Sequence, residues 1–121
     1  MRALVQRVSQ ASVSIDGSVQ GEIAHGLLVL LGITHEDGAD DRNYLIRKLL
    51  QLRIFKDEEG KMNLDVQQAG GGLLVVSQFT LFGDTKKGNR PSFVRSAPPE
   101  VAIPQYEAFL QALEQAHGQP V

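Results

Sequence analysis

Two long apolar runs constrain the fold of this chain more than any other feature. Residues 27–33 (LLVLLGI) and 73–76 (LLVV) contain no polar side chain, so a strand built from either run is apolar on both faces. Such a strand is stable only where other parts of the protein cover both faces. We therefore predict that 27–33 is a central strand and that another central strand runs from Leu73 to Thr80.

Shorter segments around these runs predict further strands. Residues 3–8 and 11–15 are two of them, and in the second the apolar residues alternate with serines, as in a half-buried strand. Asp16-Gly17 is typical of a tight hairpin turn, because glycine tolerates a positive φ, and 19–24 is the predicted returning strand. Residues 55–61 (FKDEEGK) predict another hairpin around their glycine.

Two segments have the apolar spacing of an amphipathic helix. The first follows a polar break at 37–41, and its apolar residues recur at helical intervals up to Leu52. The second begins at Pro99 or Pro104 and ends near Ala116, with one apolar face formed by Tyr106, Phe109, Leu110 and Leu113. We expect Pro104 in the first turn, where a missing N–H costs nothing. The residues alone thus indicate one α/β domain.

Composition excludes several classes of protein. The chain has no cysteine, which rules out a disulfide scaffold, a thiolate nucleophile and a zinc site that uses sulfur. Its three histidines are far apart, so we expect no metal and no cofactor. The net charge of −2 means that any contact with nucleic acid must come from a local patch. No segment resembles a signal peptide or a membrane span, so we expect a cytoplasmic protein that has no membrane partner.

Polar side chains end the predicted strand 73–80. If the strand continues to Thr80, alternation places Gln78 and Thr80 on one face and Ser77 and Phe79 on the other. Polar groups at the end of a buried strand need hydrogen-bond partners. Two interpretations remain open at this point: these groups cap the strand, or they line a binding pocket at its end.

The loop that follows is rich in cations. It carries Lys86, Lys87, Arg90 and Arg95, and such a run is either a solvated loop or a phosphate-binding surface. No nucleophile, base and orienting group are recognisable together, and Thr80 alone is a poor nucleophile at neutral pH. Asp84 and the run Asp57-Glu58-Glu59 are most simply turn residues.

Ordered sequence blocks resemble the D-aminoacyl-tRNA deacylase family, which is also called the D-Tyr-tRNA deacylase family. The central block is Ser77-Gln78-Phe79-Thr80-Leu81, followed by Lys87-Gly88-Asn89-Arg90-Pro91-Ser92-Phe93. Further blocks match in order at 1–8 (MRALVQRV), 26–32 (GLLVLLG), 52–55 (LRIF) and 60–63 (GKMN). Several blocks in the same order make the resemblance far more specific than any single short motif.

The resemblance implies a fold and a reaction. The fold is a single layered β/β/α domain over 1–121, with mixed, barrel-like sheets and two main helices, and it acts as a homodimer. The reaction is hydrolysis of the ester between a D-amino acid, or glycine, and the acceptor end of tRNA. The resemblance implies that Ser77, Gln78, Phe79 and Thr80 line the pocket for the aminoacylated adenosine, and that Arg7 braces a loop inserted by the partner subunit. We add Lys86, Lys87 and Arg90 as candidates for contacts with the tRNA backbone.

An aminoacyl ester is already activated, so its hydrolysis does not require a strong protein nucleophile. We expect the backbone amides around Phe79 and Thr80 to stabilise the oxyanion, and a ribose hydroxyl of the tRNA to position water. Thr80 as a covalent nucleophile is the competing hypothesis. The resemblance also implies a C-terminal Asn-x-Gly-Pro-Val-Thr segment that excludes L-amino acids; the printed sequence stops at Val121 without it, and we expect that the sequence is truncated.

Two other functions stay open on the residues alone. One is a tRNA- or RNA-binding module without catalysis. The other is a dimerisation module in which the polar end of strand 73–80 has a structural role.

Overall fold

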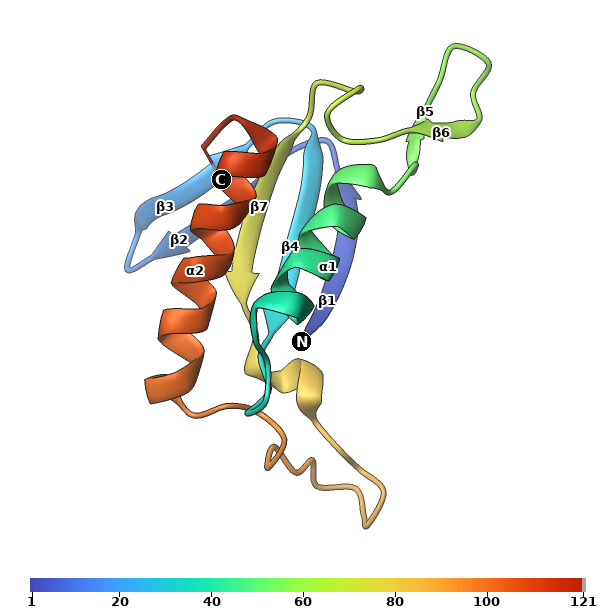
Figure 1. Cartoon of the computed structure of the whole chain (residues 1–121). Helices are drawn as coiled ribbons and strands as arrows, with labels where there is room; N and C mark the ends of the chain where they lie inside the picture. The colour runs from blue at the N-terminus through green and yellow to red at the C-terminus, as the bar shows by residue number, and fades with distance from the viewer. Residues whose placement is uncertain (121) are drawn as a thin grey trace.

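The structure, a computed structural model, describes residues 1–120 (Figure 1). Its elements in chain order are β1 (Arg2–Val8), β2 (Ala11–Ile15), β3 (Ser18–Ile23), β4 (Gly26–Gly32), α1 (Ala39–Gln51), β5 (Phe55–Lys56), β6 (Met62–Leu64), β7 (Gly72–Ser77), the short 3₁₀ helix η1 (Phe79–Phe82) and α2 (Pro99–His117). The predicted strands, hairpins and helices are all present, with ends that differ by a few residues.

A mixed sheet in the order β1-β4-β7 forms the centre of the molecule. β4 runs antiparallel to β1 and parallel to β7. The side chains of Leu27, Val29 and Leu31, on one face of β4, are completely buried, and Leu28 and Leu30 on the other face are half-buried. The prediction that 27–33 is a central strand is therefore confirmed.

The helices α1 and α2 cover one face of this sheet (Figure 1). Leu49 of α1 and Phe109 and Leu113 of α2 are at most 1% exposed, which confirms the predicted apolar faces of both helices. On the opposite face the β2–β3 hairpin packs against β7, where a side chain at Gly21 would meet Leu74 at 3.0 Å. The fold is thus an α/β arrangement of hairpin, mixed sheet and helices, as predicted.

The hairpin turn at Asp16-Gly17 has the predicted chemistry. Both residues have positive φ, 51° and 79°, which is the conformation of a type I′ turn. β2 and β3 pair antiparallel on either side of it. The sequence signal was sufficient here because the turn depends only on its own two residues.

The prediction that one strand runs from Leu73 to Thr80 is wrong at its end. β7 stops at Ser77, and the chain then turns into η1. The amide of Gln78 donates to Leu31 O (2.8 Å), but β4 itself ends at Gly32 and offers β7 no further partner. Because Thr80 lies in a helical turn, the predicted alternation of side chains stops at Ser77.

The expected position of Pro104 is also wrong. Pro99 occupies the first turn of α2, and Pro104 lies inside the helix. The ring of Pro104 leaves the carbonyl of Glu100 without its helical donor, and both residues are exposed, so water can replace the missing hydrogen bond.

A hydrogen bond joins α2 to the central sheet. The Tyr106 hydroxyl donates to Val75 O on β7 (2.9 Å). Burial raises the pKa of Tyr106 above its ordinary value of 10.0.

A partly buried ion pair joins Met1, just before β1, to the loop before α1. The amino group of Met1 lies 2.6 Å from Asp37 Oδ1, and the two side chains are 1% and 4% exposed. Asp37 Oδ2 also accepts the amide of Thr34 (2.8 Å). We predict that Asp37→Asn lowers the free energy of unfolding by about 2 kcal/mol, because it removes the charged hydrogen-bond partner of a partly buried ammonium. Urea unfolding measures the change.

The matched control for this prediction is Asp40→Asn. Asp40 is exposed in the first turn of α1, where its charge contributes less than about 1 kcal/mol through the helix dipole. Equal losses in the two variants would contradict a special role for Asp37.

Candidate active site at the end of β7

The residues predicted to line the pocket lie together at the turn from β7 into η1. Ser77, Phe79 and Thr80 are exposed and Gln78 is half-buried. Gln78 Nε2 donates to Thr80 Oγ1 (2.7 Å), so these two polar side chains are neighbours although they do not alternate along a strand. The structure thus presents a polar, accessible surface where the apolar strand ends.

Two backbone amides at this turn have no partner within the helix. The hydrogen bonds at the two ends of η1 run from Leu81 N to Gln78 O (3.4 Å) at its start and from Gly83 N to Thr80 O (3.0 Å) at its end. The amides of Phe79 and Thr80 precede these bonds, as the first amides of any helical turn do. They are positioned by the rest of the turn, since Ser96 Oγ donates to Phe79 O (2.8 Å). Two adjacent donors of this kind suit an oxygen that gains negative charge.

An aromatic and cationic cluster adjoins these amides. The rings of Phe79 and Phe93 meet edge to face, with centroids 5.2 Å apart and an interplanar angle of 75°. The guanidinium groups of Arg2 and Arg95 lie 4.6 and 5.5 Å from the centre of the Phe82 ring. Sequence reasoning did not single out Arg2 as a site residue, because nothing local to it predicts that β1 brings it beside η1.

The cationic loop follows η1. Its base is closed by a bridge between Asp84 and Ser92, with backbone hydrogen bonds of 2.8 Å in both directions. Lys86, Lys87 and Arg90 are exposed around a hollow of about 510 Å³. Asp84 Oδ1 accepts the amide of Lys86 (2.9 Å), which is the turn role predicted for it.

Arg7 lies away from the other predicted site residues. It pairs with Leu27 at one end of β4, whereas Ser77 pairs with Leu31 near the other end, four residues along the strand and so about 13 Å away. Arg7 Nη1 donates to Ile54 O (2.6 Å). Within one chain, therefore, the structure does not bring Arg7 to the turn at 77–80.

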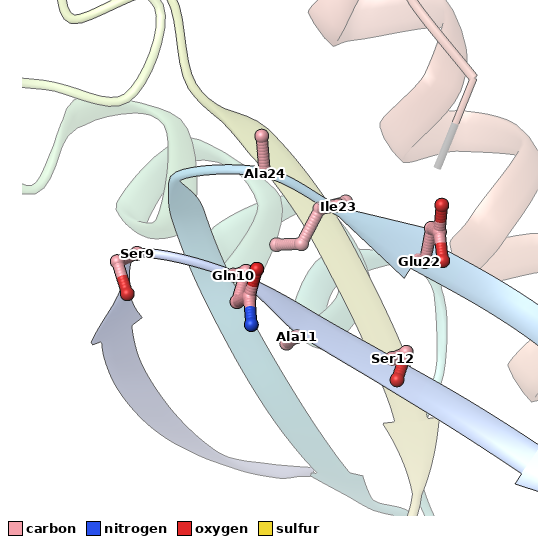
Figure 2. A pocket seen from close by; sticks show the side chains of 7 residues that line it. All are labelled: Ser9, Gln10, Ala11, Ser12, Glu22, Ile23 and Ala24. Carbon is pink, nitrogen blue, oxygen red and sulfur yellow. The ribbon is translucent and has the colours of Figure 1, made fainter.

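A cavity of about 690 Å³ lies between the start of β2 and the end of β3, and Glu22 is the only titratable residue that lines it (Figure 2).

The acidic run Asp57-Glu58-Glu59 forms a turn, as predicted. The Asp57 carboxylate accepts the amides of Glu59 and Lys61, and the hydrogen bond from Lys61 holds the pKa of Asp57 below its usual range.

Residues 1–120 contain no cluster of three or more metal-ligating side chains. None of their helices combines the length and apolar character needed to cross a membrane.

Comparison with known proteins places the chain in a family. The model of the D-Tyr-tRNA(Tyr) deacylase family matches residues 4–121, and the chain belongs to this family of hydrolases. Relatives from Opitutus terrae and Anaeromyxobacter dehalogenans, both named D-aminoacyl-tRNA deacylase, are 55% identical over 120 residues and 57% identical over 115. These alignments cover 99% and 95% of this chain, and 80% and 77% of the relatives. The family resemblance predicted from the sequence is confirmed.

Solved structures share the fold. One named c-Myc DNA Unwinding Element Binding Protein is 42% identical, with a TM-score of 0.91 over 96% of this chain and 78% of that one. A probable eukaryotic D-amino acid tRNA deacylase is 20% identical, with a TM-score of 0.77 over 96% of this chain and 68% of that one, and at this identity the likeness concerns the fold alone.

Proposed function

We propose that this chain hydrolyses the ester that joins a D-amino acid to the terminal adenosine of tRNA. The products are free tRNA and the D-amino acid, and the reaction proofreads translation; glycine, being achiral, is a second expected acyl group. The relatives named D-aminoacyl-tRNA deacylase support this function. The observation that carries it is the exposed turn at 77–80, where two adjacent amides have no helical partner.

In the proposed mechanism the protein stabilises charge and the substrate helps to activate water. A water molecule adds to the ester carbonyl, and the amides of Phe79 and Thr80 stabilise the resulting oxyanion. A neighbouring ribose hydroxyl of the tRNA positions the water. The bond between the carbonyl carbon and the ribose oxygen then breaks, and a proton from the water passes to that oxygen. Ser77 and Gln78 line the pocket, and Gln78 orients Thr80 through their hydrogen bond.

The role of Thr80 separates this mechanism from a covalent one. We predict that Thr80→Ala lowers kcat about fivefold, the cost of the one hydrogen bond from Gln78. If Thr80 were the nucleophile, its loss would cost about a million-fold. Single-turnover hydrolysis of D-tyrosyl-tRNA measures the change, and Thr85→Ala in the adjoining loop is the control.

Lys86, Lys87 and Arg90 are the proposed contacts with tRNA phosphates. All three are exposed around one hollow in the loop that follows η1. Cations are the side chains that hold a phosphate backbone, Lys as a point charge and Arg as a fork. The substrate also supports a cytoplasmic location, where charged tRNA is used.

The proposed assembly is a homodimer of single domains. The sheet face opposite the helices is apolar and incompletely covered, since Leu4 is 56% exposed and Leu28 and Leu30 are half-buried. A second copy would cover it, and Arg7 would then brace a loop of the partner subunit. Sedimentation at micromolar concentration tests the assembly: a single species at the monomer mass of 13.2 kDa would reject it.

The test of the function compares matched D- and L-tyrosyl-tRNA. Release of the D-amino acid above the spontaneous rate supports the proposal, and no release rejects it.

A non-catalytic nucleic-acid-binding module is the second candidate function, favoured by the similar structure that is named for DNA binding. Such a module would still bind tRNA at low salt, with a log–log salt slope of about −0.7 to −0.9 per phosphate contact. A dimerisation module would not bind it.

A further inference from the structure

Two aromatic side chains are left in solvent beside the proposed active site. Phe79 is 57% exposed and Phe93 is 37% exposed, although their rings are in contact with each other. Each ring therefore keeps apolar surface in water, which the fold does not require. An exposed aromatic face is a stacking surface for the bases of single-stranded nucleic acid, because every base has a flat π-face.

Two arginines contact η1 close to the two exposed rings. Arg2 Nη1 donates to Leu81 O (2.8 Å), two residues after Phe79, and Arg95 follows Phe93 by two residues. Phe82 is buried, and the guanidinium groups of Arg2 and Arg95 lie against its ring. Among residues 1–120, neither arginine forms an ion pair such as Met1–Asp37 or Lys61–Glu59. Their positive charges are thus uncompensated within the described chain, although Arg2 uses Nη1 on Leu81 O.

The segment that carries Phe93 and Arg95 is held firmly in place. The amide of Ala97 donates to Ile33 O (2.9 Å), Ser96 donates to Phe79 O, and a His35 ring nitrogen lies 2.9 Å from Val94 O. The Phe93 ring also packs on Gly83, where a side chain would meet it at 3.1 Å. The rings and cations therefore form a preorganised surface, which lowers the entropy lost when a ligand binds.

We propose that Phe79, Phe93, Arg2 and Arg95 form a docking surface for the unpaired nucleotides that precede the terminal adenosine of tRNA. Bases stack on the two rings, and the guanidinium groups bind the phosphates between them. This inference rests on the proposed function, because an ester held at the amide of Phe79 brings the preceding nucleotides beside the side chain of the same residue. Figure 1 shows η1 and the loop after it extending from the sheet at the end opposite β5 and β6.

The first experiment compares two substrates, D-tyrosyl-tRNA and 3′-O-D-tyrosyl-adenosine, which lacks the preceding nucleotides. The measured quantity is the ratio of their kcat/KM values. We expect Phe93→Leu to lower this ratio about tenfold, through KM for the tRNA, and Phe93→Tyr to restore it because tyrosine keeps the aromatic face. Tyr44→Leu is the matched control: Tyr44 is an exposed ring that has Lys48 beside it, on α1, away from the site. An unchanged ratio in Phe93→Leu would overturn the docking surface while leaving the deacylase function intact.

The second experiment needs no catalysis, so it also decides the case in which neither substrate is hydrolysed. Binding of a single-stranded RNA probe that ends in CCA is measured by fluorescence anisotropy over a range of salt. We expect the double variant Arg2→Gln/Arg95→Gln to bind more weakly and to reduce the log–log salt slope by about 1.4, the value for two phosphate contacts. Absence of probe binding at low salt, or equal slopes for the double variant and the unaltered chain, would contradict the proposal. Circular dichroism melting verifies that each variant is folded.

Discussion

Replacing Phe79 with proline is expected to lower kcat for D-aminoacyl-tRNA about 100- to 1000-fold relative to Phe79→Ala. Both variants lose the aromatic ring, but only proline also removes the amide that we propose as an oxyanion donor. The loss of one such donor typically has this effect on kcat. Single-turnover hydrolysis under saturating enzyme measures the difference, and the pair of variants isolates the amide from the ring.

The fold can accept proline at this position. Phe79 is the first residue of η1, its amide has no partner within the helix, and Gln78 before it is extended, as a residue before proline prefers. Thermal unfolding of the two variants should therefore give similar midpoints. Equal kcat values for the folded proline and alanine variants would show that this amide does not act in the reaction.

Gly26→Ala is expected to prevent stable folding. Gly26 has a φ of +157°, and a β-carbon there would lie 2.0 Å from Gly72 O and 2.7 Å from Gly72 N. These atoms belong to β7, which pairs with β4 at this point, so the clash forces the two central strands apart. We expect a loss of at least about 4 kcal/mol, in the range reserved for severe steric and backbone strain.

Circular dichroism with urea unfolding tests this prediction. Gly88→Ala is the matched control, because a β-carbon at Gly88 meets nothing within 4 Å and its change in stability should stay within about 0.5 kcal/mol. A folded Gly26→Ala variant with near-normal stability would contradict the close approach of β4 and β7.

Local signals accounted for most of the fold. The apolar run of β4, the Asp16-Gly17 turn and the apolar face of α2 were all predicted correctly, because each depends on residues close together in sequence. The end of β7 could not be predicted, since it depends on where β4 stops offering partners. The place of Pro104 was missed for a related reason, because a helix can accept an internal proline where the freed carbonyl faces water.

Sequence patterns singled out the residues of the turn at 77–80, but not the residues that reach this turn from elsewhere in the fold. The polar change after Val76 pointed to Ser77–Thr80, and the cation-rich loop was visible from composition. Arg2 and Ser96 reach η1 only through the tertiary fold, across 79 and 17 residues of sequence. The separation of Arg7 from this site within one chain follows from the register of β1 on β4, which no local pattern fixes.

The most direct test is an NMR titration of the ¹⁵N-labelled chain with the amide-linked, non-hydrolysable analogue 3′-(D-tyrosylamino)adenosine. If the ester binds where β7 turns into η1, the backbone amide signals of Phe79 and Thr80 shift together and exchange more slowly with solvent. Unchanged signals from both amides at saturation, with shifts gathered instead around the cavity at Ser9–Ser12 and Glu22–Ala24, would contradict the account.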